Sequence, residues 1–484
     1  MIPKLSLVLV PVVVLSVVLI LPVVLLVVLL IILVLPVVLF VLILIVVLVV
    51  PKVLVVLAIV IHFQCSFAFL FMIIICLSRE RYSQNDFEKN CMGVILILII
   101  NAKIMSMNDK VFENGCVLVK GNTIIKVAEK IELSKNHDEC VIDAKGCWVM
   151  PGLIEAHCHI GISEEKVGTD GNDCNEITEP VTPYLKAIDA INPMDAAFHN
   201  AIKAGITSVM VGPGSSNVVG GQFAFIKTNG RRIDDMIVLE PAAMKVAFGE
   251  NPKKNYGNNN MMPSTRMSVG AMLREELFYA RQYYEQKQSS EKAGEAFEVN
   301  PRRECWLPVF RKEIPLKAHV HRTDDILTAI RIAKLFDLDL TLDHCTEGHL
   351  IDAAVKESGF PAIVGPSLAS RNKIEVQYSD FKTAGVLHKA GVKVAITTDH
   401  PVSLIQYLPL CAGLAAKEGL GIDEGLKAIT TNAAEICNVS HRVGSLEPGK
   451  DADIAIFDGN PMDTFTNCLY TIIDGAIVYK SDKA

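Results

Sequence analysis

The chain has 484 residues, a formal net charge of −7 and a pI near 6.0. Its length exceeds that of a usual single domain and leaves room for one large α/β barrel and a smaller second domain. Neither the net charge nor any block of Lys and Arg provides a basic surface for nucleic acid, so we exclude nucleic acid as a partner.

The first 77 residues account for most of the chain's high mean hydropathy of +0.37. No charged residue lies between Lys4 and Lys52, and Val, Leu, Ile and Pro dominate this run. It is long enough for two membrane spans, and residues 53–77 provide a third candidate, because a span needs about 20 apolar residues. The apolar run as a whole is too long for a secretory signal. The alternative is low-complexity sequence of little functional meaning, since the small and aromatic residues usual in membrane bundles are lacking.

The cysteines bear on the compartment in which the protein works. All 13 are scattered, without a CxxC pair or a short-spaced framework. This pattern is typical of free thiols in a reducing compartment rather than of a disulfide scaffold. We therefore expect a cytoplasmic catalytic domain, which residues 5–77 would anchor to a membrane if they insert in one.

Two segments far apart in the sequence predict one small β domain. Short apolar runs at residues 117–119 and 124–125 flank the turn signal Gly121-Asn122, which is typical of hairpin strands. Residues 453–457 and 476–479, near the C-terminus, show the same pattern. We predict a small β-sandwich built from residues 93–150 and 443–484.

The intervening residues 151–442 predict a parallel α/β domain. Strand-like runs alternate with helical patterns such as residues 325–336. The runs are residues 153–159, 206–211, 244–248, 316–321, 340–344, 362–364 and 392–397. Eight such units make a (β/α)8 TIM barrel, whose functional residues sit at the carboxyl ends of the strands. We also expect a long helix at residues 267–285, followed by an exposed insertion at residues 286–298.

Histidines at the end of the first run suggest a metal site. His157 and His159 are two residues apart, so on a strand both side chains share a face and can point at one ion. Cys158 between them points the other way and is interpreted as a packed thiol. Taken alone, this pair would fit a structural role equally well.

Later strand ends repeat the same residue types. His319 and His321 lie on one face of a strand, and His321 is the preferred ligand because it is nearer the strand end, whereas His319 fits a hydrogen-bonding partner inside the barrel. His344 and Asp399 end two further strands. A lone strand histidine is often an ordinary core residue, but this ordered set predicts one shared site.

The sequence resembles the amidohydrolase superfamily, and within it the imidazolonepropionase-like and metal-dependent prolidase-like branches. The motifs that carry the resemblance are PGLIEAHCH at residues 151–159, His321 and His344 at strand ends, TTDHP at 397–401 and VGSLEPGKDADIAIFD at 443–458. It covers residues 94–484 and leaves the apolar N-terminus unexplained.

The resemblance implies one or two divalent metal ions, zinc being the expected one. The family completes a second metal position with a carboxylated lysine or a nearby glutamate, and Lys245 and Glu250 are the candidates here. Lys245 is preferred, because it lies on the strand before that of His321. The ligand set implied is His157, His159, Lys245, His321, His344 and Asp399, with His319 and Glu250 as alternatives.

Two features could shape a substrate pocket. The glycine-rich residues 212–222 match neither a dinucleotide nor a P-loop pattern, so we expect backbone packing near the site rather than phosphate binding. Lys253, Lys254, Arg322 and Arg371 could meet a substrate carboxylate, although scattered surface charge is the favoured interpretation for most of them. Substrate-binding residues are otherwise unassigned.

The working hypothesis is a metal-dependent amidohydrolase that cleaves a non-peptide amide or cyclic amide of a small molecule through metal-bound hydroxide. Asp399 would take the proton of the water and later deliver it to the leaving nitrogen. The alternatives on the same site are a ring deaminase and a Xaa-Pro-type dipeptidase. A non-catalytic scaffold is disfavoured by the complete His and Asp set, and a membrane channel by the absence of polar pathway residues. The substrate, the number of metals and whether the chain forms a homo-oligomer are left open.

Overall fold

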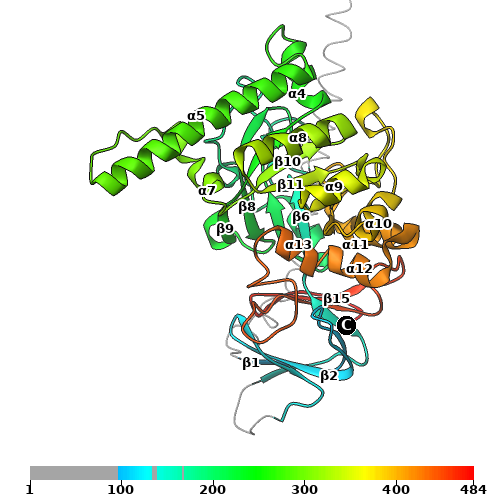
Figure 1. Cartoon of the computed structure of the whole chain (residues 1–484). Helices are drawn as coiled ribbons and strands as arrows, with labels where there is room; N and C mark the ends of the chain where they lie inside the picture. Colours follow the sequence, from blue (N-terminus) through cyan, green and yellow to red (C-terminus); the bar gives the residue numbers. More distant parts are fainter. Residues whose placement is uncertain (1–95, 133–138, 166–167) are drawn as a thin grey trace, which may run out of the picture. The chain divides into compact units, whose positions relative to one another are not determined.

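The computed structural model describes residues 96–132, 139–165 and 168–484. These residues form two β-sheets with helices around one of them (Figure 1). The predicted membrane segment at residues 1–77 lies outside the described residues. Within the described part of the chain, no helix combines the length and the apolar character needed to cross a bilayer.

The larger sheet has eight strands in sequential order and follows the predicted barrel. Its strands, in spatial order, are β6 (Leu153–Cys158), β7 (Ile206–Val211), β8 (Val219–Lys227), β9 (Ile237–Ala247), β10 (Leu316–Val320), β11 (Leu340–His344), β12 (Ala362–Val364) and β13 (Val394–Ile396). The seven predicted runs are therefore confirmed as strands. At the seam between β6 and β13, the His159 amide donates to the His400 carbonyl over 2.9 Å, which nearly closes the sheet.

The sheet differs from a regular (β/α)8 barrel at β8. This strand runs antiparallel to both β7 and β9, whereas the other paired neighbours run parallel. The reason is the length of the connections: a parallel crossover needs about a dozen residues or more, and residues 212–218 between β7 and β8 are too few. Two helices of the expected alternation are consequently missing here, and the eighth strand begins inside the segment that we interpreted as a glycine-rich loop, residues 212–222.

Helices follow the other strands (Figure 1). They are α3 (Ala196–Lys203), α4 (Glu250–Gly257), α5 (Arg266–Ala293), α6 (Pro301–Glu304), α7 (Leu307–Phe310), α8 (Thr323–Phe336), α9 (Asp352–Ser358), α10 (Lys382–Lys389), α11 (Leu408–Ala415), α12 (Ile422–Ala428) and α13 (Thr431–Ile436). The predicted helix at residues 325–336 is confirmed as α8.

The predicted long helix is also confirmed as α5, but it extends further than expected. Thr265 and Ser268 form a capping box at its start, and Gly294 ends it with a φ of 70°, a conformation in which glycine is favoured. Part of the expected insertion at residues 286–298 is therefore helical. Figure 1 shows this helix projecting away from the barrel.

The smaller sheet contains strands from both flanks of the barrel, and it is a single eight-stranded sheet where we predicted a small β-sandwich. Its order is β16-β15-β14-β5-β1-β2-β3, with β4 beside β1. The strands are β1 (Leu96–Met105), β2 (Val111–Lys120), β3 (Thr123–Ala128), β4 (Glu139–Asp143), β5 (Trp148–Pro151), β14 (Ile454–Phe457), β15 (Cys468–Ile473) and β16 (Ala476–Lys480). Antiparallel pairing of β5 with β14 connects the two flanks.

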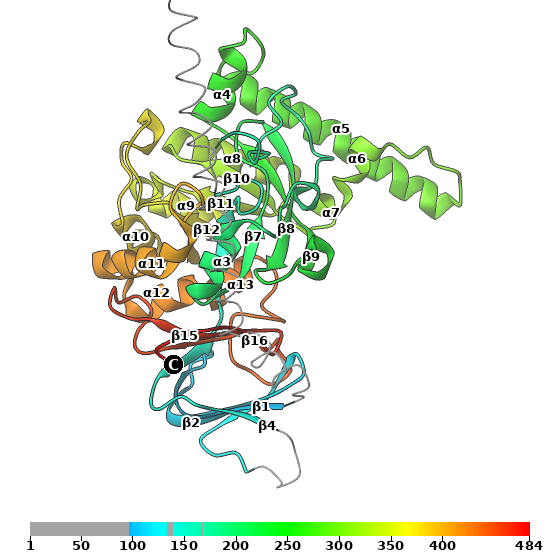
Figure 2. The same cartoon turned by 180° about the vertical axis from the view of Figure 1, so that it is seen from behind.

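This sheet curls around its own apolar core, so that β1 and β2 lie below β15 and β16 in Figure 2. Ile99, Val119, Ile454 and Ile472 are almost completely buried and pack in one cluster. Because residues from both ends of the chain supply this core, removing them from water holds the two flanks together.

Candidate metal centre

The predicted metal-binding residues meet at the carboxyl ends of the barrel strands. His157 and His159 lie at the end of β6, Lys245 on β9, His319 and His321 at the end of β10, His344 at the end of β11, and Asp399 just after β13. All seven are at most 9% exposed. Cys158 is also buried, and its thiol donates to the Met210 carbonyl, as expected of a packed thiol.

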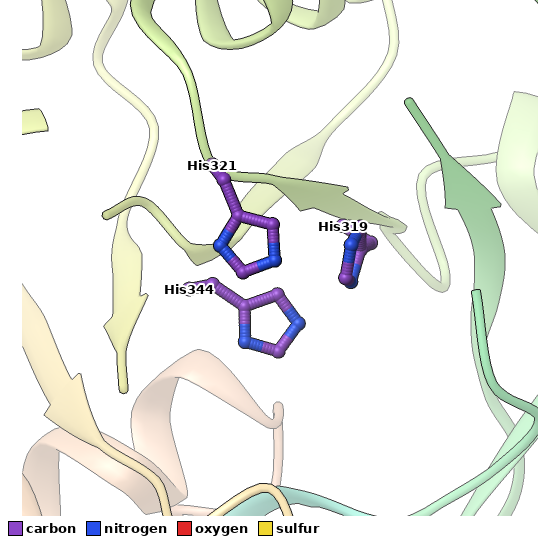
Figure 3. A group of neighbouring side chains, drawn as sticks. All are labelled: His319, His321 and His344. Carbon is purple, nitrogen blue, oxygen red and sulfur yellow. The ribbon is translucent and has the colours of Figure 1, made fainter. Parts of the chain in front are cut away.

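Two groups of these side chains have the geometry to hold a metal ion. Within the group of His319, His321 and His344, the ligand atoms lie within 4.8 Å of one another, and the same holds for His157, His344 and Asp399. Figure 3 shows the first group, in which the rings of His321 and His344 stack at a centroid distance of 4.9 Å. His344 belongs to both groups, so the arrangement can accommodate one ion or two neighbouring ions.

Hydrogen bonds from outside the centre fix how three imidazoles are turned. The Nδ1 atoms of His159 and His344 lie 2.7 Å from the carbonyls of Gly212 and Gly365. The Nδ1 atom of His321 lies 2.7 Å from the Thr346 hydroxyl. When Nδ1 is engaged in this way, Nε2 is left for a metal. The Gly212 contact also confirms that the glycine-rich segment packs against the site.

His157 and His319 complete this comparison of the imidazoles. The Nδ1 atom of His157 lies 2.9 Å from a carboxylate oxygen of Asp343. His319 differs, because its Nε2 atom faces the Asn251 amide at 3.5 Å. Alternation along β10 turns both His319 and His321 inward, so the structure brings together two residues of which only one was expected to be a ligand.

Asp399 lies among the histidines. Its Oδ1 atom is 3.3 Å from Nε2 of His159 and 3.5 Å from Nε2 of His157. Although buried, Asp399 Oδ1 and His344 Nε2 have no hydrogen-bond partner in the described part of the chain. A buried polar atom without a partner is unfavourable, and a divalent cation among these donors would satisfy both atoms.

Backbone strain is concentrated at the same point. His344 and Asp399 have φ angles of 69° and 52°, in the left-handed region that side chains other than glycine rarely adopt. Such residues cost on the order of 1–3 kcal/mol each and are frequent at functional sites.

Burial controls the electrostatics of the centre. It lowers the pKa values of His157, His319, His321 and His344, with neighbouring positive groups adding to the effect. These imidazoles are therefore neutral at neutral pH, which is the form that ligates metals. Burial alone would raise the pKa of Asp399, but the surrounding histidines hold it well below its usual range. His159 is the exception: burial alone would lower its pKa, but Cys174 and Asp399 raise that pKa to about 10. The centre of the metal-free protein thus combines one carboxylate with four neutral imidazoles and one protonated imidazole.

The structure separates the two candidates for the second metal position. The Nζ atom of Lys245 lies 3.3 Å from His157 Nε2, at the centre of the barrel. Burial lowers its pKa to about 8, and the Lys317 charge adds to this while Asp343 and Asp399 act in the opposite direction. Glu250 begins α4 instead, and its carboxylate pairs with Lys254 rather than with a histidine.

Sequence reasoning missed a set of charged residues behind the ligands. Asp343 accepts hydrogen bonds from Lys317 and Thr341 while it faces His157. Glu155 accepts from the amide and hydroxyl of Thr398 at 2.9 and 2.6 Å. A sequence signal was available, namely a charged residue within an otherwise apolar strand. Glu155, Lys317 and Asp343 all fit this description, and the structure buries all three. Partners of this kind orient metal ligands.

The four basic residues that could meet a substrate carboxylate are not scattered. Lys253, Lys254, Arg322 and Arg371 line one pocket at the same end of the barrel. The structure therefore places these four residues together, whereas we favoured charges scattered over the surface for most of them.

Comparison with known proteins gives the following relationships. The model of the "Amidohydrolase family" matches residues 318–479. A crystal structure of an amidohydrolase from Thermotoga maritima MSB8 is 40% identical, covers 80% of this chain and 100% of its own, and has a TM-score of 0.77.

Two curated relatives extend these matches. Amidohydrolase tasK of Hapsidospora irregularis is 27% identical over 75% of this chain, which spans only 39% of that protein. The imidazolonepropionase of Picrophilus torridus is 25% identical over 72% of this chain and 87% of its own length. The superfamily that we identified from the sequence motifs is confirmed.

Proposed function

This chain belongs to the amidohydrolase family, and we propose that it hydrolyses a carbon–nitrogen bond in a small molecule. The substrate class that we favour is a non-peptide amide or a cyclic amide. Relatives named amidohydrolase and imidazolonepropionase support this choice. The observation that carries the proposal is the buried set of inward-facing imidazoles around the Asp399 carboxylate, whose Oδ1 atom has no hydrogen-bond partner in the described part of the chain.

In this proposal His157, His159, His321 and His344 hold a divalent ion, which we take to be zinc. The chemistry that such an ion supplies when bound is a water whose pKa is lowered towards about 7. Three of these histidines are oriented by carbonyl or hydroxyl groups and the fourth by Asp343, so their Nε2 atoms need little rearrangement to bind. A fixed ligand shell of this kind keeps the reacting groups positioned.

Asp399 is the residue that we propose to move the proton. It is ionised, because the histidines keep its pKa low, and its Oδ1 atom faces the space between His157 and His159. We propose that it accepts a proton from the attacking water and passes it to the leaving nitrogen. General acid–base catalysis of this kind contributes a factor of about 10² to 10⁴.

Metal analysis combined with a substrate screen tests this function. The purified full-length chain should contain zinc or another divalent ion and should hydrolyse at least one member of a panel of cyclic amides, N-acyl amino acids and dipeptides. Release of ammonia from a ring would favour the deaminase alternative, and activity restricted to Xaa-Pro dipeptides would favour the dipeptidase. A chain that binds metal but cleaves nothing in the panel would contradict the proposal.

Single alanine variants assign the ligands. We expect His321→Ala and His344→Ala to lose most of their metal, because both present a free Nε2 atom to the centre. His319→Ala is the matched control on the same strand, and it should retain more metal, because its Nε2 atom faces Asn251. Full metal retention in His344→Ala would make that residue an ordinary core histidine.

We also propose that Lys245 is carboxylated and bridges two ions. An amine repels a divalent cation when protonated, whereas a carbamate offers two anionic oxygens. The position of Lys245 beside His157 supports this role, and the pairing of Glu250 with Lys254 argues against the competitor. Metal-free protein should then need bicarbonate as well as metal to regain activity. If bicarbonate has no effect and Glu250→Ala loses metal while Lys245→Ala does not, the bridging role belongs to Glu250.

A further inference from the structure

A basic pocket lies at the catalytic end of the barrel. It has a volume of about 840 Å³ and is lined mainly by α4 and the start of α5, by Arg322 and by residues 371–375. These segments follow β9, β10 and β12, and the loops after barrel strands are where substrates bind in this class of fold. The size suits an organic molecule, because ligand pockets usually measure about 300–1,000 Å³.

Positive charge in this pocket exceeds what its carboxylates neutralise. The lining includes six cationic side chains, Lys253, Lys254, Arg266, Arg322, Arg371 and Lys373, but only two carboxylates, Glu250 and Glu375. Four of the cations have acidic partners: Lys254 pairs with Glu250, Arg266 with Asp325, Arg322 with Asp324, and Lys373 with Glu375.

Two cations of the pocket stand apart from these pairs. Lys253 and Arg371 have no acidic partner in the described ranges 96–132, 139–165 and 168–484, and Arg371 donates only to the Ser379 carbonyl. Most donors of both side chains are therefore available to a ligand, since an ammonium has three N–H groups and a guanidinium five.

A single layer of side chains separates the floor of the pocket from the histidines of the metal centre. Lys373 donates to Asn251 over 2.9 Å and to Glu375 over 3.1 Å, which leaves one of its three N–H groups. The Asn251 amide lies 3.5 Å from His319 Nε2, and Glu375 lies 3.9 Å from His321 Nε2. Asn251 and Glu375 thus lie between the pocket and the histidines, none of which lines the pocket itself.

A glycine allows this floor to form. Gly249, before α4, has a φ of 86°, and a Cβ atom there would approach the Glu375 carboxylate to 2.7 Å. The chain therefore passes close to Glu375, whose Oε2 atom accepts the Glu250 amide over 2.7 Å. These contacts fix Glu375, which in turn holds Lys373.

We propose that this pocket binds a carboxylate group of the substrate, so that the enzyme acts on amides or cyclic amides that carry a carboxylate at the end remote from the scissile bond. The inference rests on the proposed function. Arg371 provides a planar pair of donors that matches a carboxylate, and Lys253 and Lys373 provide point charges. N-acyl amino acids are the simplest compounds of this class.

Binding to the metal-loaded protein tests the pocket without requiring turnover. Calorimetry would compare succinate with the neutral succinamide, in the wild type and in the double variant Lys253→Gln Arg371→Gln. We expect succinate to bind at least about tenfold more weakly to the double variant, because charge-assisted hydrogen bonds are lost. Lys334→Gln is the matched control, since it removes one charge from the exposed last turn of α8, and it should bind succinate like the wild type.

Three results would overturn the assignment. They are equal succinate binding by the double variant and the wild type, equal binding of succinate and succinamide by the wild type, and preferential binding of inorganic phosphate, which would assign the pocket to a phosphate group. An unchanged melting temperature of the double variant excludes misfolding as the cause of a loss.

Kinetics separates this inference from the proposed function. With an N-acyl amino acid, the double variant should show a KM raised about tenfold at unchanged kcat, because the lost contacts are far from the reacting bond. The corresponding N-acyl amino acid amide should be cleaved equally by both proteins. Absence of cleavage of every member of the panel by the wild type would contradict the proposed function. Cleavage of other members but of neither of these two compounds, or cleavage of both with the same KM, would contradict only the carboxylate pocket.

Discussion

Two buried lysines in the same barrel have opposite surroundings. Lys227, at the end of β8, lies where the barrel meets the smaller sheet, and its Nζ atom is 2.7 Å from Asp453 and 2.8 Å from Asp451. Lys245, on β9, lies in the metal centre, and its nearest polar contact is the imidazole of His157 at 3.3 Å. Both side chains are almost completely buried, with residue exposures of 3% and 0%.

The pKa values of these lysines diverge accordingly. Burial alone would lower the pKa of Lys227, but the carboxylates of Asp453, Asp474 and Asp451 raise it above its ordinary value. The pKa of Lys245 falls to about 8. The difference teaches that counter-charge, and not burial, separates a lysine that stabilises a junction from one that is available for chemistry.

The largest effect should come from a change in the metal centre, the region in which Lys245 lies. Replacing Asp399 with Asn removes the proposed proton acceptor but leaves the histidines in place. Turnover should fall by a factor of about 10² to 10⁴, while metal content stays nearly unchanged. Kinetic assay together with metal analysis checks this. A variant with turnover close to the wild type would show that Asp399 does not move the proton.

A change at Lys227, the lysine of the junction, should instead lower the stability of the protein. Lys227→Met leaves Asp453, which is 3% exposed, without its counter-ion. We expect the free energy of unfolding to fall by about 3–5 kcal/mol, as when one partner of a buried ion pair is removed. Denaturant unfolding measures this, with Lys334→Met, at an exposed position of α8, as the control. Metal content per folded molecule should not change, and an unchanged stability would mean that Lys227 does not hold the junction.

The two regions also differ in how far the sequence could predict them. Seven barrel strands were identifiable because each is a short apolar run between turn signals. The strand β8 was not, because its first residues, Val219, Gly220 and Gly221, resemble a loop. Its reversed direction follows from the short connections on either side. The strands of the smaller, curled sheet were predictable from the sequence. Their order was not, because it depends on the pairing of β5 with β14.

Site residues were predictable from the sequence where the spacing along one strand is enough to place their side chains. His157 and His159 share a strand face, so spacing alone placed them together. Lys317 and Asp343 acquire their role only because neighbouring strands bring them within 3.3 Å. The basic pocket likewise has Lys253 and Arg371, more than a hundred residues apart in the sequence, in one lining, and no local pattern reveals that they are neighbours in this pocket.

The pH dependence of Lys245 sharpens the comparison. Its pKa in the folded protein, about 8, is below the ordinary value. Its contribution to stability is therefore present above pH 10 and is lost as the pH falls through 8. Lys245→Met should gain stability relative to metal-free, carbon dioxide-free wild type by on the order of 3 kcal/mol between pH 10 and pH 7. Urea unfolding of both proteins checks this, and a difference that is independent of pH would contradict it.

Lys227 should show the smallest effect, because its pKa is shifted in the opposite direction. A lysine with a raised folded-state pKa contributes stability that is fully present below the unfolded pKa of about 10.4 and is lost as the pH rises through the folded value. The stability difference between wild type and Lys227→Met should thus be constant from pH 6 to pH 9 and shrink only above pH 10. The same urea series measures it. A difference that already changes between pH 7 and pH 9, as expected for Lys245, would show that the two lysines are electrostatically alike and that the acidic residues at the junction do not set the charge state of Lys227.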